Sequence, residues 1–373
     1  MIGEVILVLV VLAFAWNLGA HYTGAVMGMP YAARAIALWP ALVLIGVFAL
    51  LGATFASGRV EETVGRHIIT DRLVSVPDAI VIVLAAGVLT MLYTYWKIPT
   101  STIQILVFCV VGVGLAGNIP IHWTTIGELA IVWVCAPLVA FGLGYVFTRL
   151  LDLVIPAAAA RARTAQQVSA PMAGRPADHG SATEHRGTLV RAFPGVALAW
   201  SQGELPGESA VGPVANAALR NLPALLVLVG VAASFVLGAN DVANATGALI
   251  LTHTTSLTLA GLIGGIAMAV GALTWGRRIL HTVAFDVVKM DLTMASAAQG
   301  IQALVVLTAA TQGLFTSMNQ ALIGAMAGTG LARGRETVQR TQILAILRGW
   351  LIGPLSGLVV AFALEWLVRE LLR

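Results

Sequence analysis

The chain has 373 residues, of which 58% are hydrophobic and only 10% are charged. Its mean hydropathy of +0.91 excludes a soluble globular domain, and it has room for about ten membrane segments at roughly 20 apolar residues each. The formal net charge of +4 comes from arginines in short loops and in a central polar stretch, which is typical of membrane orientation and not of nucleic-acid binding.

Apolar segments cover most of the first half of the chain. The first begins without basic residues and continues past Asn17, which favours a retained membrane helix over a cleaved signal peptide. Cys109 and Cys135 both lie in apolar segments, with no redox or metal-binding pattern around them. The predicted membrane segments of this half are residues 2–28, 35–57, 76–96, 99–118 and 122–150.

A polar stretch at residues 151–221 divides the chain. It is rich in Ala, Gly, Pro, Ser and Arg, and this composition predicts a flexible linker between two membrane repeats at 1–150 and 222–373. The predicted membrane segments of the second repeat are residues 222–251, 256–276, 293–313, 315–332 and 341–368.

A carboxylate and two carboxamides lie within a predicted membrane segment, in Gly-Ala-Asn-Asp-Val-Ala-Asn-Ala at residues 238–245. A carboxylate and two carboxamides are costly in a bilayer unless they face a polar cavity or bind a ligand. A helix broken at the flanking glycines also frees backbone groups that a ligand can satisfy. Asn240, Asp241 and Asn244 are therefore candidate binding residues. The alternative is that Asn240 and Asn244, spaced i to i+4, make interhelical hydrogen bonds.

The two halves of the chain repeat each other. Gly19 corresponds to Gly238 and Gly52 to Gly271, both at a separation of 219 residues (238 − 19 = 219). Several landmark residues in one register predict a tandem duplication. Later matches keep a separation of 216 residues (317 − 101 = 216), namely Ser101 with Ser317, Gln104 with Gln320 and Gly114 with Gly330.

The distribution of Lys and Arg predicts the orientation in the membrane. If segments 76–96 and 99–118 form a re-entrant hairpin, each half has an odd number of full crossings, and the second half is inverted. A cytoplasmic linker then places most basic residues inside and both termini outside, as expected of a multi-pass protein in the cell inner (plasma) membrane. The outer face keeps a balanced set of charges, Arg59, Arg66 and Arg72 with Glu61, Glu62 and Asp71.

The two hairpin tips place hydroxyls and carboxamides between apolar arms. Their sequences are Thr-Ser-Thr-Ile-Gln at 100–104 and Thr-Ser-Met-Asn-Gln at 316–320. Hydroxyl donors together with the free amides of a helix start suit an oxyanion, although such hydroxyls also bond back to their own helix. Recurrence in both halves favours binding. The candidate ligands are Ser101, Thr102, Ser317 and Asn319.

Together these residues resemble the inorganic phosphate transporter (PiT) family, through residues 238–245, the Ser101 and Ser317 turns, and Gly-Leu-Ala-Arg-Gly at 330–334. The resemblance covers everything except the linker. It implies an all-α integral membrane protein, an inverted repeat of two halves with broken helices and re-entrant hairpins, that works as a cation-coupled secondary transporter. The anion would lie between the two signature helices and the two tips, with Asp241 and Asn244 in cation coupling.

The first half departs from that family pattern. It reads Asn-Leu-Gly-Ala-His-Tyr at 17–22, so Tyr22 stands in the Asp position and Ala25 in the second Asn position. This form is similar to the sulfate-permease branch of the family. Hydrogen phosphate can donate a proton to a carboxylate, whereas sulfate only accepts, so the donors His21 and Tyr22 favour sulfate. The alternative is that they fill the space of a lost cation site. Asn17, His21 and Tyr22 complete the set of candidate substrate ligands.

The sequence therefore predicts a carrier that imports a tetrahedral oxyanion, sulfate or thiosulfate, with a proton as coupling ion because only one signature carboxylate remains. The alternative is an inorganic phosphate symporter driven by sodium or protons, and a passive anion channel is next. No acid, base and nucleophile set indicates an enzyme, and we expect no cofactor and no metal site. The expected partners are the anion and membrane lipid, not nucleic acid; a homodimer is left open.

Overall fold

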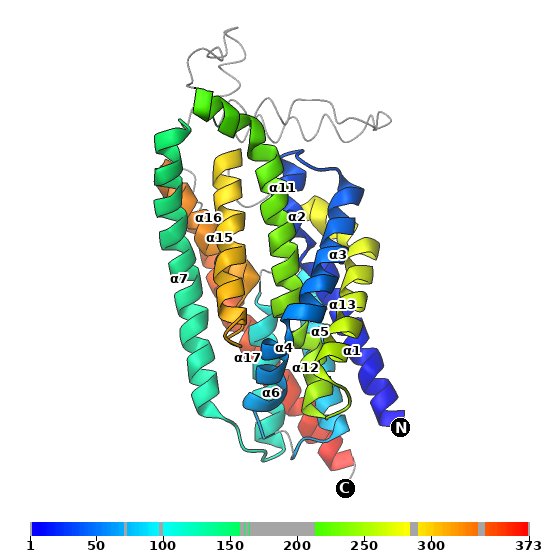
Figure 1. Cartoon of the computed structure of the whole chain (residues 1–373). Helices are drawn as coiled ribbons and strands as arrows, with labels where there is room; N and C mark the ends of the chain where they lie inside the picture. The colour runs from blue at the N-terminus through cyan, green and yellow to red at the C-terminus, as the bar shows by residue number, and fades with distance from the viewer. Residues whose placement is uncertain are drawn as a thin grey trace.

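The computed structural model describes residues 2–70, 73–96, 100–156, 160, 164, 213–283, 290–334 and 340–371. Regular structure within these ranges is helical, apart from one isolated antiparallel bridge between Ile69 and Ile121. The helices run side by side in an elongated bundle, and both chain ends lie at the same end of it (Figure 1).

Within these described ranges, eight helical segments are long and apolar enough to cross a membrane. The helices of the first half are α1 (Ile2–His21), α2 (Thr23–Ala32), α3 (Leu38–Ala56), α4 (Gly58–Glu62), the π-helix η1 (Thr63–His67), α5 (Val76–Tyr95), α6 (Thr102–Ala116) and α7 (Trp123–Val154). Those of the second half are α11 (Pro213–Asp241), α12 (Ala243–Leu251), α13 (Leu257–Thr274), α14 (Gly276–Val283), α15 (Leu292–Ala310), α16 (Met318–Arg333) and α17 (Arg340–Leu371).

These helices match the apolar segments expected from the sequence, with two differences. Two of the long segments are each interrupted at one residue, between α1 and α2 and between α11 and α12. Helix α7 also continues to Val154, and α11 already begins at Pro213, so helical structure extends into both edges of the predicted linker. The other residues of that linker lie outside the described ranges, apart from 155, 156, 160 and 164.

Helices α5 and α6 form a hairpin, and the segments before α5 and after α6 contact each other at its base. There Ile69 pairs with Ile121, and the His122 amide donates to the Ile68 carbonyl at 2.9 Å. The N-cap of α5 is a reciprocal capping box between Ser75 and Asp78, which satisfies the first amides of the helix.

Helices α15 and α16 form the second hairpin, with its base at the opposite end of the bundle. Arg333 at the end of α16 donates to Thr293 at the start of α15 at 2.8 Å, and it contacts Asp152 near the end of α7. Because α7 starts beside the base of the first hairpin and ends beside the base of the second, the two hairpins enter the bundle from opposite ends.

The hairpin tips meet in the middle of the bundle. Gln104 and Gln320 occupy matching positions in the two tips, and each donates its side-chain amide to the other, at 3.5 and 3.1 Å. The second arm of each hairpin packs along a long helix of the other half, α6 on α17 and α16 on α7. Non-helical backbone at this depth is therefore enclosed by protein, as the hydrocarbon interior requires.

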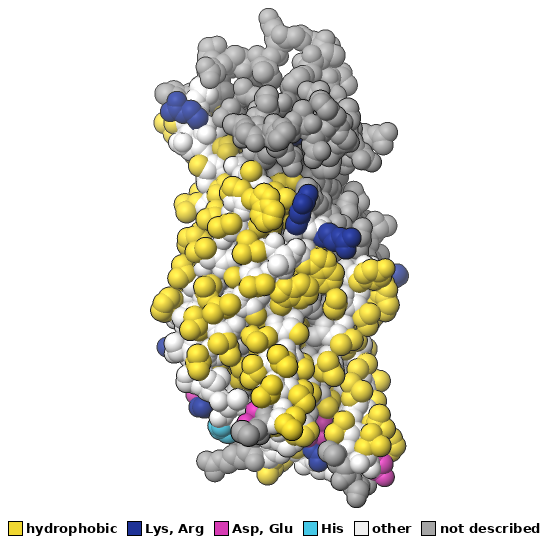
Figure 2. All heavy atoms as spheres, turned by 90° about the vertical axis from the view of Figure 1, so that its right-hand side faces the viewer, with side chains coloured by type: hydrophobic (Ala, Val, Ile, Leu, Met, Phe, Trp, Pro, Cys, Tyr) yellow, Lys and Arg dark blue, Asp and Glu magenta, His cyan; other side chains and the backbone are white. Residues whose placement is uncertain are grey.

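The surface of the bundle suits a lipid environment. Figure 2 shows one face whose middle is dominated by apolar side chains, whereas the acidic side chains gather toward its lower end. Large apolar residues such as Val47, Phe55, Leu138 and Val359 are exposed along the spanning helices. An apolar band of this kind on eight long helices is the signature of a multi-pass membrane protein.

Candidate functional site

The two signature sequences lie at interruptions of long helices. Tyr22 separates α1 from α2, and Val242 separates α11 from α12 directly after Asp241. Each interruption is narrow, because its single residue is still hydrogen-bonded to a neighbouring helix, from the Tyr22 amide to the Leu18 carbonyl and from the Thr246 amide to the Val242 carbonyl. The predicted broken helices are thus interrupted at single residues and not unwound. Even so, Tyr22 at the first interruption and Asp241 directly before the second both have buried polar side chains.

Asp241 is a fully buried carboxylate surrounded by donors. Its Oδ2 accepts from Asn240 Nδ2 at 3.0 Å, and its Oδ1 is 3.5 Å from Asn244 Nδ2. The Tyr22 hydroxyl lies against the same carboxylate. Among the described residues Asp241 makes no ion pair, so its charge is met only by neutral donors. A buried carboxylate in such surroundings must take up a proton or a cation to become neutral.

Thr102 connects the two halves at this point. Its hydroxyl lies 2.7 Å from the Tyr22 hydroxyl and accepts from Asn244 Nδ2 at 3.1 Å. These contacts fit a chain of hydrogen bonds in which Asn244 donates to Thr102, Thr102 to Tyr22, and Tyr22 to Asp241. The three elements α6, α11–α12 and the α1–α2 junction therefore converge on one hydrogen-bonded cluster.

The hairpin tips are held by helix capping. Ser101 Oγ accepts from the Gln104 amide at 3.4 Å, and Ser317 Oγ from the Gln320 amide at 3.3 Å, so both serines are N-caps. Both are completely buried. As accepting caps they keep a hydroxyl hydrogen that can still be donated to an anion.

Asn240 fixes the second tip to the signature helix. Its Nδ2 donates to the Thr316 carbonyl at 2.8 Å, and its Oδ1 accepts from the Thr316 amide at 3.3 Å. Trp133 on α7 adds a bond from its Nε1 to the Phe315 carbonyl at 3.2 Å. Asn240 therefore makes a structural contact to the hairpin in addition to facing Asp241.

The comparisons with known proteins decide the family. The model of the phosphate transporter family matches residues 18–371, nearly the entire chain. The chain belongs to the phosphate transporter family.

The relatives of this phosphate transporter family member include proteins named phosphate permeases and one named a sulfate permease. A protein of Pyrococcus abyssi that is provisionally named a phosphate permease is 26% identical over 398 residues, covering 96% of each chain. A sulfate permease of Bacillus subtilis is 25% identical, over 97% of this chain and 87% of that one. Among solved structures, a sodium-dependent phosphate transporter has a TM-score of 0.79 at 22% identity, covering 99% of this chain and all of the other. At that identity the structural likeness concerns the fold.

Of the ten residues predicted from the sequence, seven lie in or beside the central cluster of this phosphate transporter family member: Tyr22, Ser101, Thr102, Asn240, Asp241, Asn244 and Ser317. The other three lie differently. His21 Nδ1 is 2.6 Å from Thr94 Oγ1, and Asn17 Nδ2 donates to the Gly87 carbonyl at 3.2 Å, so both side chains lie against α5. Asn319 is half-buried beside the fully buried Ser317.

Sequence reasoning missed two hydroxyls at the tips. Thr100 and Thr316 occupy matching positions before Ser101 and Ser317, and the Oγ1 of each is buried without a hydrogen-bond partner among the described residues. A buried hydroxyl without a partner is costly unless a ligand or water meets it. The separation of 216 residues that matched the serines also matches these threonines (316 − 100 = 216), so the signal was present in the sequence.

A second missed feature lies on α15. Gln299 donates to the Ala25 carbonyl at 2.9 Å, and Gln302 donates to the Met318 carbonyl at 3.2 Å. These bonds tie α15 to the first signature sequence and to the second tip. The Oε1 of Gln299 stays buried without a partner. No three His, Cys, Asp or Glu side chains gather to hold a metal ion in the described part of the chain.

Proposed function

We propose that this chain is a cation-coupled secondary transporter of inorganic phosphate or a closely related tetrahedral oxyanion. The observation that carries the proposal is the buried cluster of Tyr22, Thr102 and Asp241, next to two tips capped by Ser101 and Ser317. It offers a titratable carboxylate for the cation and hydroxyl donors for the anion. The family match and the names of the relatives support phosphate as the first substrate to test.

Sulfate is the second candidate. It is favoured by Tyr22, which offers a donor where the signature of the other half has Asp241, and by the similarity to a sulfate permease of Bacillus subtilis. Sulfate only accepts hydrogen bonds near neutral pH, so a donor suits it better than a second carboxylate. More of the comparisons favour phosphate, which the sequence suggested only as the alternative.

The proposed mechanism is alternating access between two inverted halves. Support comes from hairpins that enter from opposite ends and from the matched packing of α6 on α17 and α16 on α7. Discontinuous helices and hairpins about a central site are the usual parts of such carriers. We also propose that the linker is cytoplasmic, that both termini are outside, and that the chain resides in the plasma membrane, in agreement with the positive-inside rule.

The proposed coupling ion is a proton. Asp241 is the only carboxylate in the central cluster, and a proton needs one titratable group, whereas sodium needs several oxygen ligands in a defined geometry. The structural neighbour is itself sodium-dependent, which makes sodium the alternative.

Uptake by the purified chain in proteoliposomes tests this proposal. Radiolabelled phosphate and radiolabelled sulfate are supplied separately, with an inward proton gradient, an inward sodium gradient, or neither. We expect saturable accumulation of phosphate that excess unlabelled substrate inhibits and that needs the proton gradient. Faster sulfate uptake that phosphate barely inhibits would favour the second candidate. Flux that never exceeds equilibrium under either gradient would reject a coupled carrier.

A further inference from the structure

Glu61 is a buried acid that the proposed mechanism does not use. The sequence placed it among the balanced charges of the outer face, but its side chain is completely buried between α4 and α12. Its Oε1 is 2.6 Å from Thr246 Oγ1, and its Oε2 is buried without a hydrogen-bond partner. Arg59, Glu61 and Glu62 are close in sequence, and only the packing of α4 decides which of them faces inward.

The Thr246 hydroxyl has two acceptors and one hydrogen. It lies 3.0 Å from the Val242 carbonyl as well as 2.6 Å from Glu61. When Glu61 is protonated, its carboxyl hydrogen can point to Thr246, whose own hydrogen then points to Val242. When Glu61 is ionised, the Thr246 hydrogen turns to the carboxylate. The Val242 carbonyl still accepts the Ala245 and Thr246 amides, so the Val242 carbonyl and the Thr246 hydroxyl stay hydrogen-bonded in both states.

Within the described residues, no basic side chain compensates the Glu61 carboxyl. It makes no ion pair in the described part of the chain, and Arg59 beside it donates instead to the Thr311 carbonyl. Arg66 pairs with the half-exposed Glu62, and His67 is exposed. Helices α12 and α13, which pack on α4, contain no titratable residue, and α11 contributes only Asp241 at its end on that side. Burial raises the pKa of the Glu61 carboxyl to about 7, from an ordinary value of 4.5.

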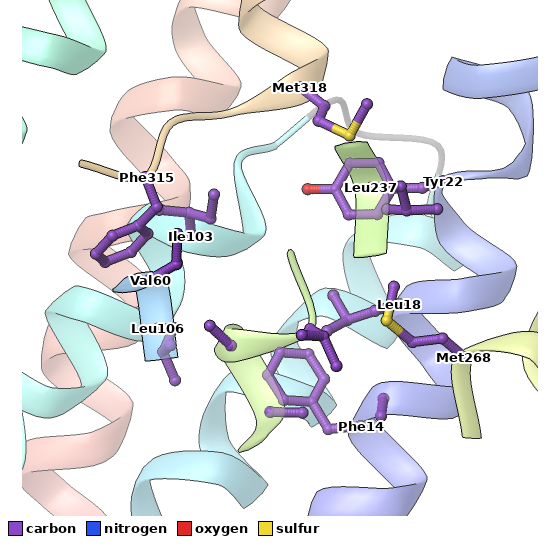
Figure 3. Packing of buried hydrophobic residues seen from close by; sticks show 14 of the residues in the cluster. Phe14, Leu18, Tyr22, Val60, Ile103, Leu106, Leu237, Met268, Phe315 and Met318 are labelled. Carbon is purple, nitrogen blue, oxygen red and sulfur yellow. The ribbon is translucent and has the colours of Figure 1, made fainter. Parts of the chain in front are cut away.

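Glu61 is connected to the central site from two directions. Thr246 follows Asp241 on the same interrupted helix, about 7.5 Å further along its axis, and the carbonyl it shares belongs to Val242, at the interruption itself. On α4, the neighbouring Val60 belongs to the buried cluster that contains Ile103 of the first hairpin and Phe315 of the second tip (Figure 3). Glu61 is therefore hydrogen-bonded to the signature helix through Thr246, and its neighbour Val60 packs in the same buried cluster as Ile103 and Phe315.

We propose that Glu61 is a proton-binding site of the transport cycle, separate from Asp241, and that Thr246 links its protonation to the helix interruption at Val242. The ligand is a proton, which needs one titratable group such as the Glu61 carboxyl, whereas a sodium ion needs several oxygen ligands in a defined geometry. This inference rests on the proposed function of cation-coupled transport.

The test compares driven and undriven transport in proteoliposomes that contain the full chain. Glu61→Gln mimics the protonated acid in size and cannot release a proton. We expect it to lose accumulation of radiolabelled phosphate, or of sulfate where that is the substrate, under a proton gradient. A gradient of one pH unit supports about tenfold accumulation per coupled proton. Counterflow exchange without a gradient, which needs no net proton movement, should stay within about twofold of the unaltered protein. The matched control is Glu62→Gln on the half-exposed neighbour, which should change neither measurement.

Infrared difference spectroscopy supplies a readout that does not depend on transport. Protein carrying Asp241→Asn should show a protonated carboxyl band that disappears as the pH rises through about 7. Adding Glu61→Gln should remove the part of that band that does not come from Glu365, which is another fully buried acid. Thr246→Val should shift the band by removing its hydrogen-bond partner, and Thr246→Ser should restore it.

Two results would overturn the inference: full proton-driven accumulation by Glu61→Gln, or no such titrating band in the Asp241→Asn protein. Loss of sodium-driven accumulation alone in Glu61→Gln would also overturn it, in favour of a sodium site. Should the unaltered protein carry no anion, the proposed function fails, and the infrared band still decides whether Glu61 binds a proton. If Glu61→Gln does not fold, the Asp241→Asn spectrum together with the Thr246 variants decides the question.

Discussion

At the scale of single residues, Asp241 is the residue on which the proposed coupling to a cation depends most. It is buried, it makes no described ion pair, and neutral donors surround it. Asp241→Asn keeps the size of the side chain and removes its charge, so we expect concentrative uptake to be abolished while the protein stays folded in the membrane. The measurement is gradient-driven uptake together with size-exclusion behaviour in detergent. Accumulation at near wild-type rates would reject the coupling role.

The serines at the tips combine a structural and a binding role, and one experiment separates the two. Ser101→Ala or Ser317→Ala removes an N-cap, worth about 1 kcal/mol of stability, and also a donor to a charged acceptor, worth about 1.5 to 3 kcal/mol. We expect the half-saturating anion concentration to rise at least about tenfold. Ser256→Ala is the control, because Ser256 caps α13 in the same way at 3.4 Å, away from the tips. Equal effects on uptake in all three variants would make the tips structural.

At the scale of helices, close crossings depend on glycine. A Cβ on Gly238 would come within 1.9 Å of the Ala49 carbonyl oxygen, and one on Gly52 would come equally close to Phe235, so α11 and α3 touch backbone to backbone. Gly238→Ala must push these helices apart, and we expect a lower thermal denaturation midpoint and reduced uptake. Gly142→Ala on α7 is the matched control, since its Cβ would meet nothing within 4 Å. That substitution should be neutral or stabilise the helix by up to about 1 kcal/mol. Equal losses in both variants would contradict the packing explanation.

At the scale of the whole molecule, two ionic clusters fasten the hairpin bases at opposite ends. Arg333 joins α16 to Asp152 of α7 at 2.9 Å and faces Asp291 at 3.6 Å, while Arg369 joins α17 to Asp78 of α5 at 3.2 Å. Arg333→Gln would leave buried charge without its partner, which costs about 3 to 5 kcal/mol. Arg66→Gln, in an exposed pair with Glu62, should change stability by no more than about 0.5 kcal/mol. Denaturation midpoints in detergent measure both, and an unchanged midpoint for Arg333→Gln would contradict the fastening role.

Much of the membrane architecture could be predicted from the sequence alone. Apolar runs of sufficient length set the helices because the hydrocarbon interior tolerates only fully bonded backbone. The same separation of 219 residues for Gly19 with Gly238 and for Gly52 with Gly271 indicated the duplication. Polar residues such as Asn240 and Asp241 inside an apolar run indicated the candidate site, because a polar side chain in the bilayer is energetically costly unless it binds something. The family resemblance was confirmed by the family model, which matches residues 18–371.

Only the tertiary structure decided which polar groups meet. Tyr22, Thr102 and Asp241 come from segments far apart in the chain, and a local pattern carries no information on such contacts. His21 is the last residue of α1, directly before Tyr22, yet its side chain turns to Thr94, because successive helical residues point about 100° apart. The sequence assigned Glu61 to the outer side of the membrane with Arg59 and Glu62, and only the packing of α4 against α12 shows that its side chain is buried and faces Thr246.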